Sequence, residues 1–385
     1  MSYFLLPNVN YNIESINITY NSENKPAISK SLNNYLNNSK QQIDDNYNNW
    51  DYIKKYTNPY EFIHTNIPGS KYSISKLKPL SRSYYKMIEI SKLLHIFENY
   101  NTSNITTFHL AEGPGGFIEA IANMRSNLND KYIGMTLIKD DPNIPGWDKS
   151  NDVLNKYKNI KIENGITNTG DLLDIENLKY CYDKYNNSCD IITADGGFDF
   201  SINFNHQEIM ATRLLFAEVS FALFMQKING IFILKIFDIF SKTTLDLIYL
   251  LSSLYKQVYI VKPNASRFAN SEKYLVCKHF KGVSQNLISS IINQYHMLSK
   301  LNYISSIFDF NLDLYYINKI EEYNAIFGQQ QIENISATIN LIHSKNKNEK
   351  IETLKKININ KAIAWCEKYN IPYNKQLVNT NIFIT

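Results

Sequence analysis

The chain has 385 residues, of which 44% are hydrophobic and 20% are charged, and its formal net charge is +4 at pH 7. This balance is typical of a globular protein with a sizeable core, and it excludes a disordered chain or a histone-like basic tail. The weak positive charge allows contact with a phosphate backbone but does not require it.

The termini, the apolar stretches and the cysteines bear on the compartment. The N-terminal apolar run ends at Pro7 without a preceding basic region, so it does not resemble a secretory signal. The most apolar stretch, residues 230–240, is too short to cross a bilayer. We expect a cytoplasmic protein that is neither secreted nor bound to a membrane. The cysteines form no CxxC pair, which argues against a zinc ribbon or a disulfide framework; they are Cys181, Cys189, Cys277 and Cys366.

The spacing of apolar residues in the first hundred positions predicts helices. Residues 1–75 are polar and rich in asparagine, and helical periodicity over residues 29–56 predicts one long helix. Residues 81–100 predict an amphipathic helix, whose apolar side is formed by Tyr84, Met87, Ile88, Leu94 and Ile96.

From residue 106 onward, short apolar runs rich in β-branched residues alternate with helical segments. This alternation predicts an α/β, Rossmann-like fold with a mostly parallel seven-stranded sheet and an antiparallel edge strand. The predicted strands are residues 106–111, 131–138, 161–166, 190–196, 230–237, 257–263 and 272–280. The predicted helices are residues 117–125, 207–228 and 243–255, and, after residue 282, residues 288–301, 329–343 and 360–369.

A glycine-rich turn follows the first predicted strand and opens a helix. It consists of Gly113, Pro114, Gly115, Gly116 and Phe117. Glycines let a backbone pass close to a ligand, and a helix N-terminus offers free N–H groups. The turn lacks the spacing of a dinucleotide fingerprint and the lysine of a P-loop, so S-adenosylmethionine fits better than NAD or ATP. A tight turn with a purely structural role is the alternative.

Four charged residues occupy positions where a site is expected. Asp195 ends a predicted strand before two glycines, and Lys235 lies within an apolar strand, where burial is costly. Glu272 opens the last strand and Lys86 lies on the helix before the sheet. Each has an ordinary alternative: a turn-capping aspartate, an edge lysine, a solvated strand end and a surface lysine. Together, two lysines and two acids can compensate one another in one pocket.

This ordered set around the GPGGF turn resembles the FtsJ/RrmJ-type 2′-O-ribose methyltransferases, and among them the cap-specific mRNA (nucleoside-2′-O-)-methyltransferases of eukaryotes and large DNA viruses. The heavy use of Asn, Ile, Tyr and Lys suggests an AT-rich coding sequence, which together with the C-terminal helices favours a large DNA virus as the source. The matching stretches are residues 58–61 (NPYE), 81–90, 113–117, 134–137 (GMTL), 170–171, 194–198 (ADGGF), 233–240 and 262–278.

The resemblance implies a division into an N-terminal extension (1–75), a methyltransferase domain (76–281) and a C-terminal helical appendage (282–385). It implies S-adenosylmethionine as cofactor, with the glycine turn around its methionine part. Asp171 would bond the adenine, Thr136 would line the adenosine side, and Asp195 would border the cofactor. Two positions depart from the family. Glu112 stands where cellular relatives have a small residue, and Leu137 and Ile138 stand where an acid would bind the ribose, with Asp140 as a doubtful substitute.

The implied substrate is capped mRNA, methylated on the first transcribed nucleotide without a metal. Lys235 would be the base of the tetrad Lys86, Asp195, Lys235 and Glu272, with its pKa lowered by desolvation and by the second lysine. Other capping enzymes are further candidate partners, and the compartment would be the host cytoplasm, a viral factory or the virion. Basic residues that could contact RNA are Arg82, Lys139 and Arg267, with Lys71, Lys76 and Lys78.

Two other functions remain open at this point. An FtsJ-like ribosomal or transfer RNA 2′-O-methyltransferase would use the same chemistry on another substrate. A catalytically inactive member could serve as a scaffold in a virion or capping complex, although all four tetrad positions are filled. A NAD-dependent dehydrogenase is disfavoured by the glycine spacing.

Overall fold

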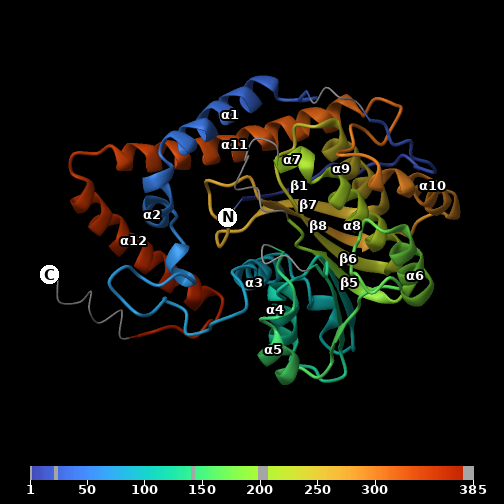
Figure 1. Ribbon diagram of the computed structural model, residues 1–385, viewed down its shortest axis with the longest axis horizontal. Helices are drawn as coiled ribbons and strands as arrows, with labels where there is room; N and C mark the ends of the chain where they lie inside the picture. Colours follow the sequence, from blue (N-terminus) through green and yellow to red (C-terminus); the bar gives the residue numbers. More distant parts are fainter. Residues whose placement is uncertain (1, 21–24, 140–143, 198–206, 376–385) are drawn as a thin grey trace.

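An eight-stranded sheet lies at the centre of the molecule (Figure 1). The structure is a computed structural model that describes residues 2–20, 25–139, 144–197 and 207–375. The strand order is β1-β7-β8-β6-β5-β2-β3-β4. The strands are β1 (Ser2–Leu5), β2 (Thr106–Leu110), β3 (Lys131–Met135), β4 (Ile160–Ile162), β5 (Cys189–Ala194), β6 (Gln226–Ile236), β7 (Tyr255–Lys262) and β8 (Lys273–Phe280).

The predicted Rossmann-like fold is confirmed, with one strand more than expected. All seven predicted strands are present, and β2 to β6 pair in parallel with one another. The last two predicted strands pair antiparallel, as expected, but β8 also pairs with β6 and so lies inside the sheet. The antiparallel edge strand is β1, which comes from the N-terminal segment and pairs with β7.

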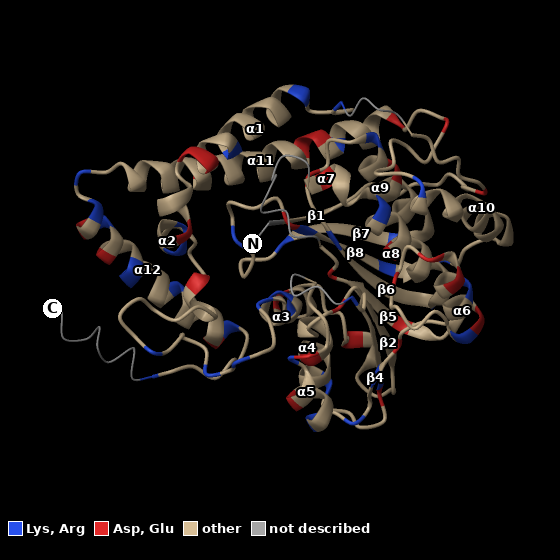
Figure 2. Cartoon of the chain, in the orientation of Figure 1, with Lys and Arg blue, Asp and Glu red and all other residues tan. Residues whose placement is uncertain are grey.

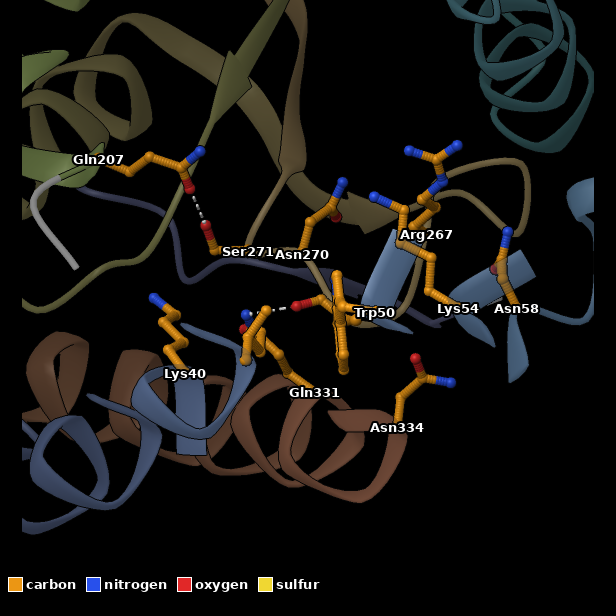
Figure 3. A pocket seen from close by; sticks show the side chains of 12 residues that line it. Lys40, Trp50, Lys54, Asn58, Gln207, Arg267, Asn270, Ser271, Gln331 and Asn334 are labelled. Atoms are coloured by element: carbon orange, nitrogen blue, oxygen red, sulfur yellow. Dashed lines mark hydrogen bonds between the residues drawn. The ribbon is translucent and has the colours of Figure 1, made fainter. Parts of the chain in front are cut away.

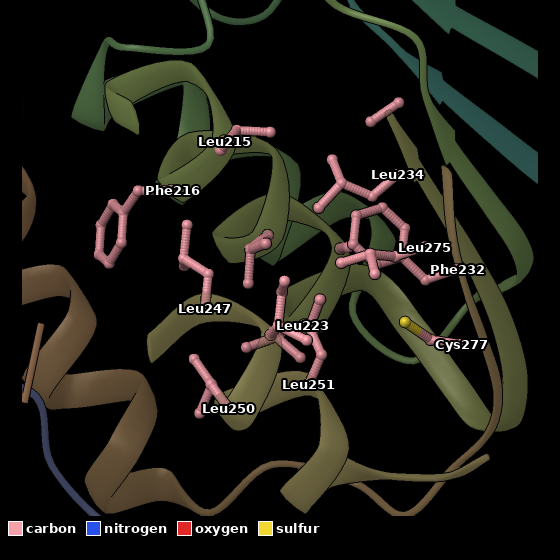
Figure 4. Packing of buried hydrophobic residues seen from close by; sticks show 14 of the residues in the cluster. Leu215, Phe216, Leu223, Phe232, Leu234, Leu247, Leu250, Leu251, Leu275 and Cys277 are labelled. Carbon is pink, nitrogen blue, oxygen red and sulfur yellow. The ribbon is translucent and has the colours of Figure 1, made fainter. Parts of the chain in front are cut away.

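Helices cover both faces of the sheet (Figure 1). One face carries α3 (Ser83–Leu93), α4 (Gly116–Arg125) and α5 (Asn151–Lys156), and the other carries α6 (Ile175–Tyr185), α7 (Gln207–Met210), α8 (Thr212–Met225), α9 (Lys242–Leu254) and α10 (Gln285–Tyr295). Figure 4 shows the second face, where leucines of α8 and α9 pack on Phe232, Leu234 and Leu275.

Alternation along β6 decides which face each side chain meets. Phe232 and Leu234 belong to the apolar cluster under α8 and α9, whereas Ile231 and Ile233 belong to the cluster under α3 and α4. Because side chains alternate along a strand, Lys235 points toward the α3 face. This places its amine on the side from which Lys86 of α3 approaches.

A further layer of helices lies beside the sheet and consists of α1 (Lys30–Asp45), α2 (Tyr47–Thr57), α11 (Leu314–Ile342) and α12 (Lys347–Lys368). The chain also contains the short 3₁₀ helices η1 (Glu61–Ile63), η2 (Glu98–Tyr100) and η4 (His296–Ser299). In Figure 1, α1 runs along α11, and α12 returns beside α2. Helix α12 carries both lysines and glutamates along its length (Figure 2).

Several predicted helices differ in extent from the observed ones. The helices expected over residues 329–343 and 360–369 are the C-terminal parts of the longer α11 and α12, and the helix expected over residues 288–301 is α10 followed by η4. The helix expected over residues 29–56 is two helices, because Asn46 leaves the helical conformation and its side-chain amide bonds the carbonyl of Gln42. The helix expected over residues 207–228 is α7 and α8 followed by the start of β6. The helix expected over residues 81–100 ends at Leu93, before His95 in the left-handed region (φ 51°). In the described part of the chain, no helix is long and apolar enough to cross a membrane.

Candidate active site

The sheet brings the four predicted tetrad residues to one edge. Asp195 directly follows β5, and Lys235 is the last residue but one of β6. Because β8 runs antiparallel to β6, the start of β8 lies beside the end of β6, and Lys235 is opposite Tyr274. Glu272, which precedes β8, therefore reaches the same edge. Lys86 comes from α3, which packs over this face.

Hydrogen bonds and ion pairs connect the tetrad. The amine of Lys86 lies 2.7 Å and 2.8 Å from the two carboxylate oxygens of Glu272. The amine of Lys235 donates to the backbone carbonyl of Asp195 at 2.7 Å and lies 3.4 Å from its Oδ1. The four side chains are only 11–15% exposed, so the space between them, called the recess below, is largely shielded from solvent.

Two neighbours that the sequence did not single out hold the acids of the tetrad in place. The Tyr274 hydroxyl donates to Asp195 Oδ1 at 2.9 Å, and the Ser266 hydroxyl donates to Glu272 Oε1 at 2.8 Å. These bonds fix the carboxylates, and the carboxylates in turn orient the two amines.

The expectation of a lowered lysine pKa is wrong for this arrangement. Burial lowers the pKa of Lys235, but the charges of Asp195, Glu272 and Glu218 outweigh it, and the pKa is raised above its usual value. Burial alone would raise the pKa of Glu272, yet the charges of Lys86 and Lys235 lower it to about 2. The second lysine fails to depress the pKa of Lys235 because Glu272 neutralises it at contact distance.

The glycine turn opens α4, as predicted, but two of the N–H groups there are already bonded. Glu112 Oε1 accepts from the backbone N–H groups of Phe117 at 2.8 Å and Ile118 at 2.9 Å. Glu112 is therefore the cap of α4, which gives a role to the residue that departs from the family pattern. Its other oxygen, Oε2, is buried and has no hydrogen-bond partner among the described residues, and burial raises the pKa of this carboxyl to about 8.

Close packing within the protein explains the glycines of this region. A Cβ on Gly113 would lie 2.0 Å from the carbonyl oxygen of Pro145, and one on Gly116 would lie 2.0 Å from the Ser83 hydroxyl. Gly115 has a φ of 108°, which few other residues adopt. The structural reason for the glycine turn is thus sufficient by itself, and contact with a cofactor stays a prediction for Gly113, Pro114, Gly115, Gly116 and Phe117.

Thr136 and Asp171 lie near each other on the far side of this turn. Thr136 is buried just after β3, and its carbonyl oxygen lies 1.9 Å from where a Cβ on Gly170 would stand. Asp171 is half-buried, and its Oδ1 accepts from the N–H of Leu173 at 2.8 Å. Leu137 is half-buried and Ile138 is exposed, whereas Asp140 lies outside the described residues.

One functional candidate was missed by the sequence reasoning. Glu218 lies on α8, is fully buried against Gly196, and forms no ion pair with the described residues. Burial raises the pKa of its carboxyl to about 8. The signal was present, because Glu218 is the only acid in the apolar segment of residues 212–225.

Two of the basic residues expected to contact RNA, Arg82 and Arg267, are tied to one buried acid. Arg82 and Arg267 each place a guanidinium nitrogen 2.8 Å from Glu61, a residue of η1 that is fully buried. The Arg82 side chain is 17% exposed and that of Arg267 is 38% exposed, so Arg267 has more surface for a ligand. Lys139 is exposed, as are Lys71, Lys76 and Lys78, and their contact with RNA stays a prediction. Within the described residues, no cluster of histidine, cysteine and acidic side chains could hold a metal ion.

Comparison with known proteins identifies a methyltransferase family for this chain. The FtsJ-like methyltransferase family model matches residues 79–280, more than half of the chain. A cap-specific mRNA (nucleoside-2′-O-)-methyltransferase 1 of Trypanosoma cruzi is 32% identical over 213 residues, which cover 52% of this chain and 57% of that protein. A cap-specific mRNA (nucleoside-2′-O-)-methyltransferase 2 of Mus musculus is 27% identical over 266 residues, which cover 66% of this chain and 34% of that protein.

The chain spans about half the length of the curated relatives that it matches. Among solved structures, a putative ribosomal RNA methyltransferase of Plasmodium falciparum aligns with a TM-score of 0.37 and 22% identity, covering 52% of this chain and 98% of that one.

Proposed function

The chain belongs to the FtsJ-like methyltransferase family, and from this premise we propose that it methylates the ribose 2′-hydroxyl of the first transcribed nucleotide of capped mRNA. The observation that carries the proposal is the tetrad, in which Lys235 and Asp195 meet Lys86 and Glu272 at the open edge of the sheet. The cap-specific substrate is supported by the names of the relatives, which share this part of the chain.

S-adenosylmethionine is the proposed methyl donor, and the described residues fit it. Its sulfur carries a positive charge, and this edge of the sheet offers Asp195 and the unpaired Oε2 of Glu112 as negative or polar partners. The resemblance assigns Asp171 and Thr136 to the adenosine, and the close packing of Gly170, which precedes Asp171, on the carbonyl of Thr136 supports this assignment. When bound, the donor supplies a methyl group, so that one C–S bond breaks and one C–O bond forms.

Lys235 is the proposed base. A ribose hydroxyl is a weak nucleophile until its proton leaves, and a neutral amine in contact with it accepts that proton. Asp195 orients the amine through its backbone carbonyl and its carboxylate, 2.7 Å and 3.4 Å away. Lys86 and Glu272 form the second pair of the recess, and alignment of the hydroxyl within it contributes the rest of the rate.

The test uses the purified protein, S-adenosylmethionine labelled in its methyl group, and short RNAs that differ only at the 5′ end. The ends are an N7-methylated cap, an unmethylated cap and a triphosphate, and nuclease digestion locates the label. We expect label on the first ribose of capped RNA. We also expect Lys235→Ala to reduce the rate by about a thousandfold, because a positioned base contributes on the order of 10²–10⁴.

The controls separate the alternatives. Lys242→Ala removes a lysine that pairs with Asp246 on α9, away from the recess, and should leave the rate within about twofold. Label on an internal ribose, or equal label on uncapped RNA, would contradict the cap-specific substrate. Absence of label with the donor still bound would contradict an active enzyme and favour the scaffold.

A further inference from the structure

A cavity of about 220 Å³ lies next to the recess, between the outer helices and the loop that leads into β8 (Figure 3). One wall is the segment of residues 267–271, and the facing walls come from α1, α2 and α11. Figure 3 shows the indole of Trp50 near its centre, with Lys54 and Arg267 on one side of it. The cavity is therefore built largely by parts of the chain outside the segment that matches the family.

The lining of this cavity combines an aromatic surface with cations. Trp50 and Ile43, each 7% exposed, supply a small apolar surface, and the charged side chains are all basic: Lys40, Lys54 and Arg267. Lys40 is buried and paired with Asp238 at 2.8 Å, whereas Arg267 is 38% exposed. Arg267 is paired with Glu61 and Lys54 with Asp51, but both keep exposed surface, 38% and 24% of the side chain, that a phosphate can contact.

One polar atom in the wall lacks a partner. Asn58 is 2% exposed, and its side-chain N–H donates to Glu61 at 2.7 Å, but its Oδ1 is buried without a hydrogen bond. A buried carbonyl oxygen without a donor is costly in a folded protein. A ligand can donate to this oxygen only if the Asn58 side chain turns toward the cavity, because the oxygen itself is buried.

The cavity also shares its wall with the tetrad. Ser271 lines the cavity and directly precedes Glu272. Asn270 lines it too, and its side-chain oxygen accepts from the amine of Lys262 at 2.8 Å, while the carbonyl of Glu272 accepts from the same amine at 2.9 Å. A ligand in the cavity would thus contact the segment that directly precedes Glu272 of the tetrad.

We propose that this cavity holds a transcribed nucleotide of the RNA strand next to the one that is methylated, with its neutral base against Trp50 and its phosphate at Arg267 and Lys54. The proposal rests on the proposed RNA substrate. A neutral base is favoured over the cationic N7-methylated guanine because the described lining contains no acidic side chain that would pair with a cation. Stacking on an aromatic ring and contact of phosphate with basic groups are how proteins hold single-stranded RNA.

The test measures binding, so it does not depend on methyl transfer. Ala269→Leu places extra side-chain volume in the cavity, and Lys54→Gln removes a charge from its rim. The matched controls are Ala325→Leu, on the exposed surface of α11, and Lys55→Gln, the neighbour of Lys54. Fluorescence anisotropy of a labelled uncapped RNA pentanucleotide gives the dissociation constant, and the same RNA with an N7-methylated cap gives the contribution of the cap.

We expect Ala269→Leu to weaken binding of both RNAs by about tenfold, the loss of one stacked base. Lys54→Gln should weaken both by about threefold, with less effect at high salt, and the controls should bind like the unaltered protein. Unchanged binding in both variants would overturn the proposal. It would also be overturned if only the capped RNA lost affinity, or if a free N7-methylated cap dinucleotide competed for the cavity, since the occupant would then be the cap. If methyl transfer fails but these binding losses appear, the subsite stands without the proposed reaction.

Discussion

The tetrad and two neighbouring acids, Glu112 and Glu218, lie near the carboxyl ends of the parallel strands, yet their charges are balanced differently. In the tetrad each charge has a partner, Lys86 with Glu272 and Lys235 with Asp195. By contrast, Glu112 and Glu218 are buried without a cation in contact, and the pKa of each is raised to about 8. The raised pKa of Lys235 and the lowered pKa of Glu272 favour their charged forms, whereas Glu112 and Glu218 are neutral acids near neutral pH.

This difference separates two consequences of burial. A buried ion pair keeps its geometry as long as both partners are charged, but losing one partner leaves an uncompensated charge. A buried unpaired acid lowers the stability of the fold only at pH values where the unfolded chain would release its proton. The tetrad is therefore sensitive to substitution, and the two neighbouring acids are sensitive to pH.

The largest expected effect concerns the pH dependence of methyl transfer. The pKa of Lys235 is raised, so the amine is protonated at neutral pH, and only the neutral fraction accepts a proton. That fraction grows about tenfold per pH unit below the pKa, so the rate should rise about a hundredfold from pH 7 to pH 9. Single-turnover rates under saturating RNA measure this, with a donor-binding assay at each pH as the control. A rate that is flat over this range would contradict Lys235 as the base.

The next prediction tests the paired set. Glu272→Gln leaves the Lys86 charge without a partner, and the free energy of unfolding should fall by about 3 kcal/mol at pH 7. The pKa of Glu272 is lowered to about 2, so its stabilisation is present above the ordinary carboxyl pKa and is lost as the pH falls toward 2. Urea unfolding at pH 7 and pH 3 should therefore show a smaller difference at pH 3.

A matched control for that variant is Glu322→Gln, which breaks the exposed pair with Lys319 on α11. Exposed pairs contribute little, so the expected loss is below about 1 kcal/mol. Equal losses for the two variants would mean that burial of the tetrad pair adds nothing.

The unpaired set gives an effect of the opposite sign. Between the ordinary carboxyl pKa and about 8, the unfolded chain is ionised at Glu218 while the folded chain is protonated, so stability falls as the pH rises. Glu218→Gln does not titrate. It should match the unaltered protein at pH 4 and be more stable by roughly 4 kcal/mol at pH 8. Urea unfolding at both values measures this, with the exposed Glu333→Gln as control; a destabilised variant at pH 8 would show that the ionised carboxylate is needed.

Local patterns in the sequence were enough to locate the sheet and its charged residues. Short apolar runs predicted all seven strands. A buried strand needs apolar side chains along its own length, so its pattern is visible without knowledge of distant segments. Asp195, Lys235 and Glu272 were found because a charge at the end or within an apolar strand is unusual. The parity of β6 even fixes which face Lys235 shares with Ile231 and Ile233.

Helix ends and the edge strand could not be predicted from such patterns. The break at Asn46 and the end of α3 at Leu93 depend on local hydrogen bonds and on a left-handed residue, which periodicity does not reveal. Strand β1 is only four residues long and pairs with β7 more than 250 positions away, so nothing near it in the chain marks it as an edge strand.

The sequence by itself determined where seven of the strands lie along the chain, the turn at Gly113 to Gly116 and which four charged residues to examine. Only the tertiary structure decided how these charges are paired, because the distance between Lys86 and Glu272 depends on how α3 packs over β8. It also decided the direction of the Lys235 pKa and the capping role of Glu112. The physical reason is common to all three: electrostatic energy depends on separations of a few ångströms and on burial, and both arise only when distant segments pack together.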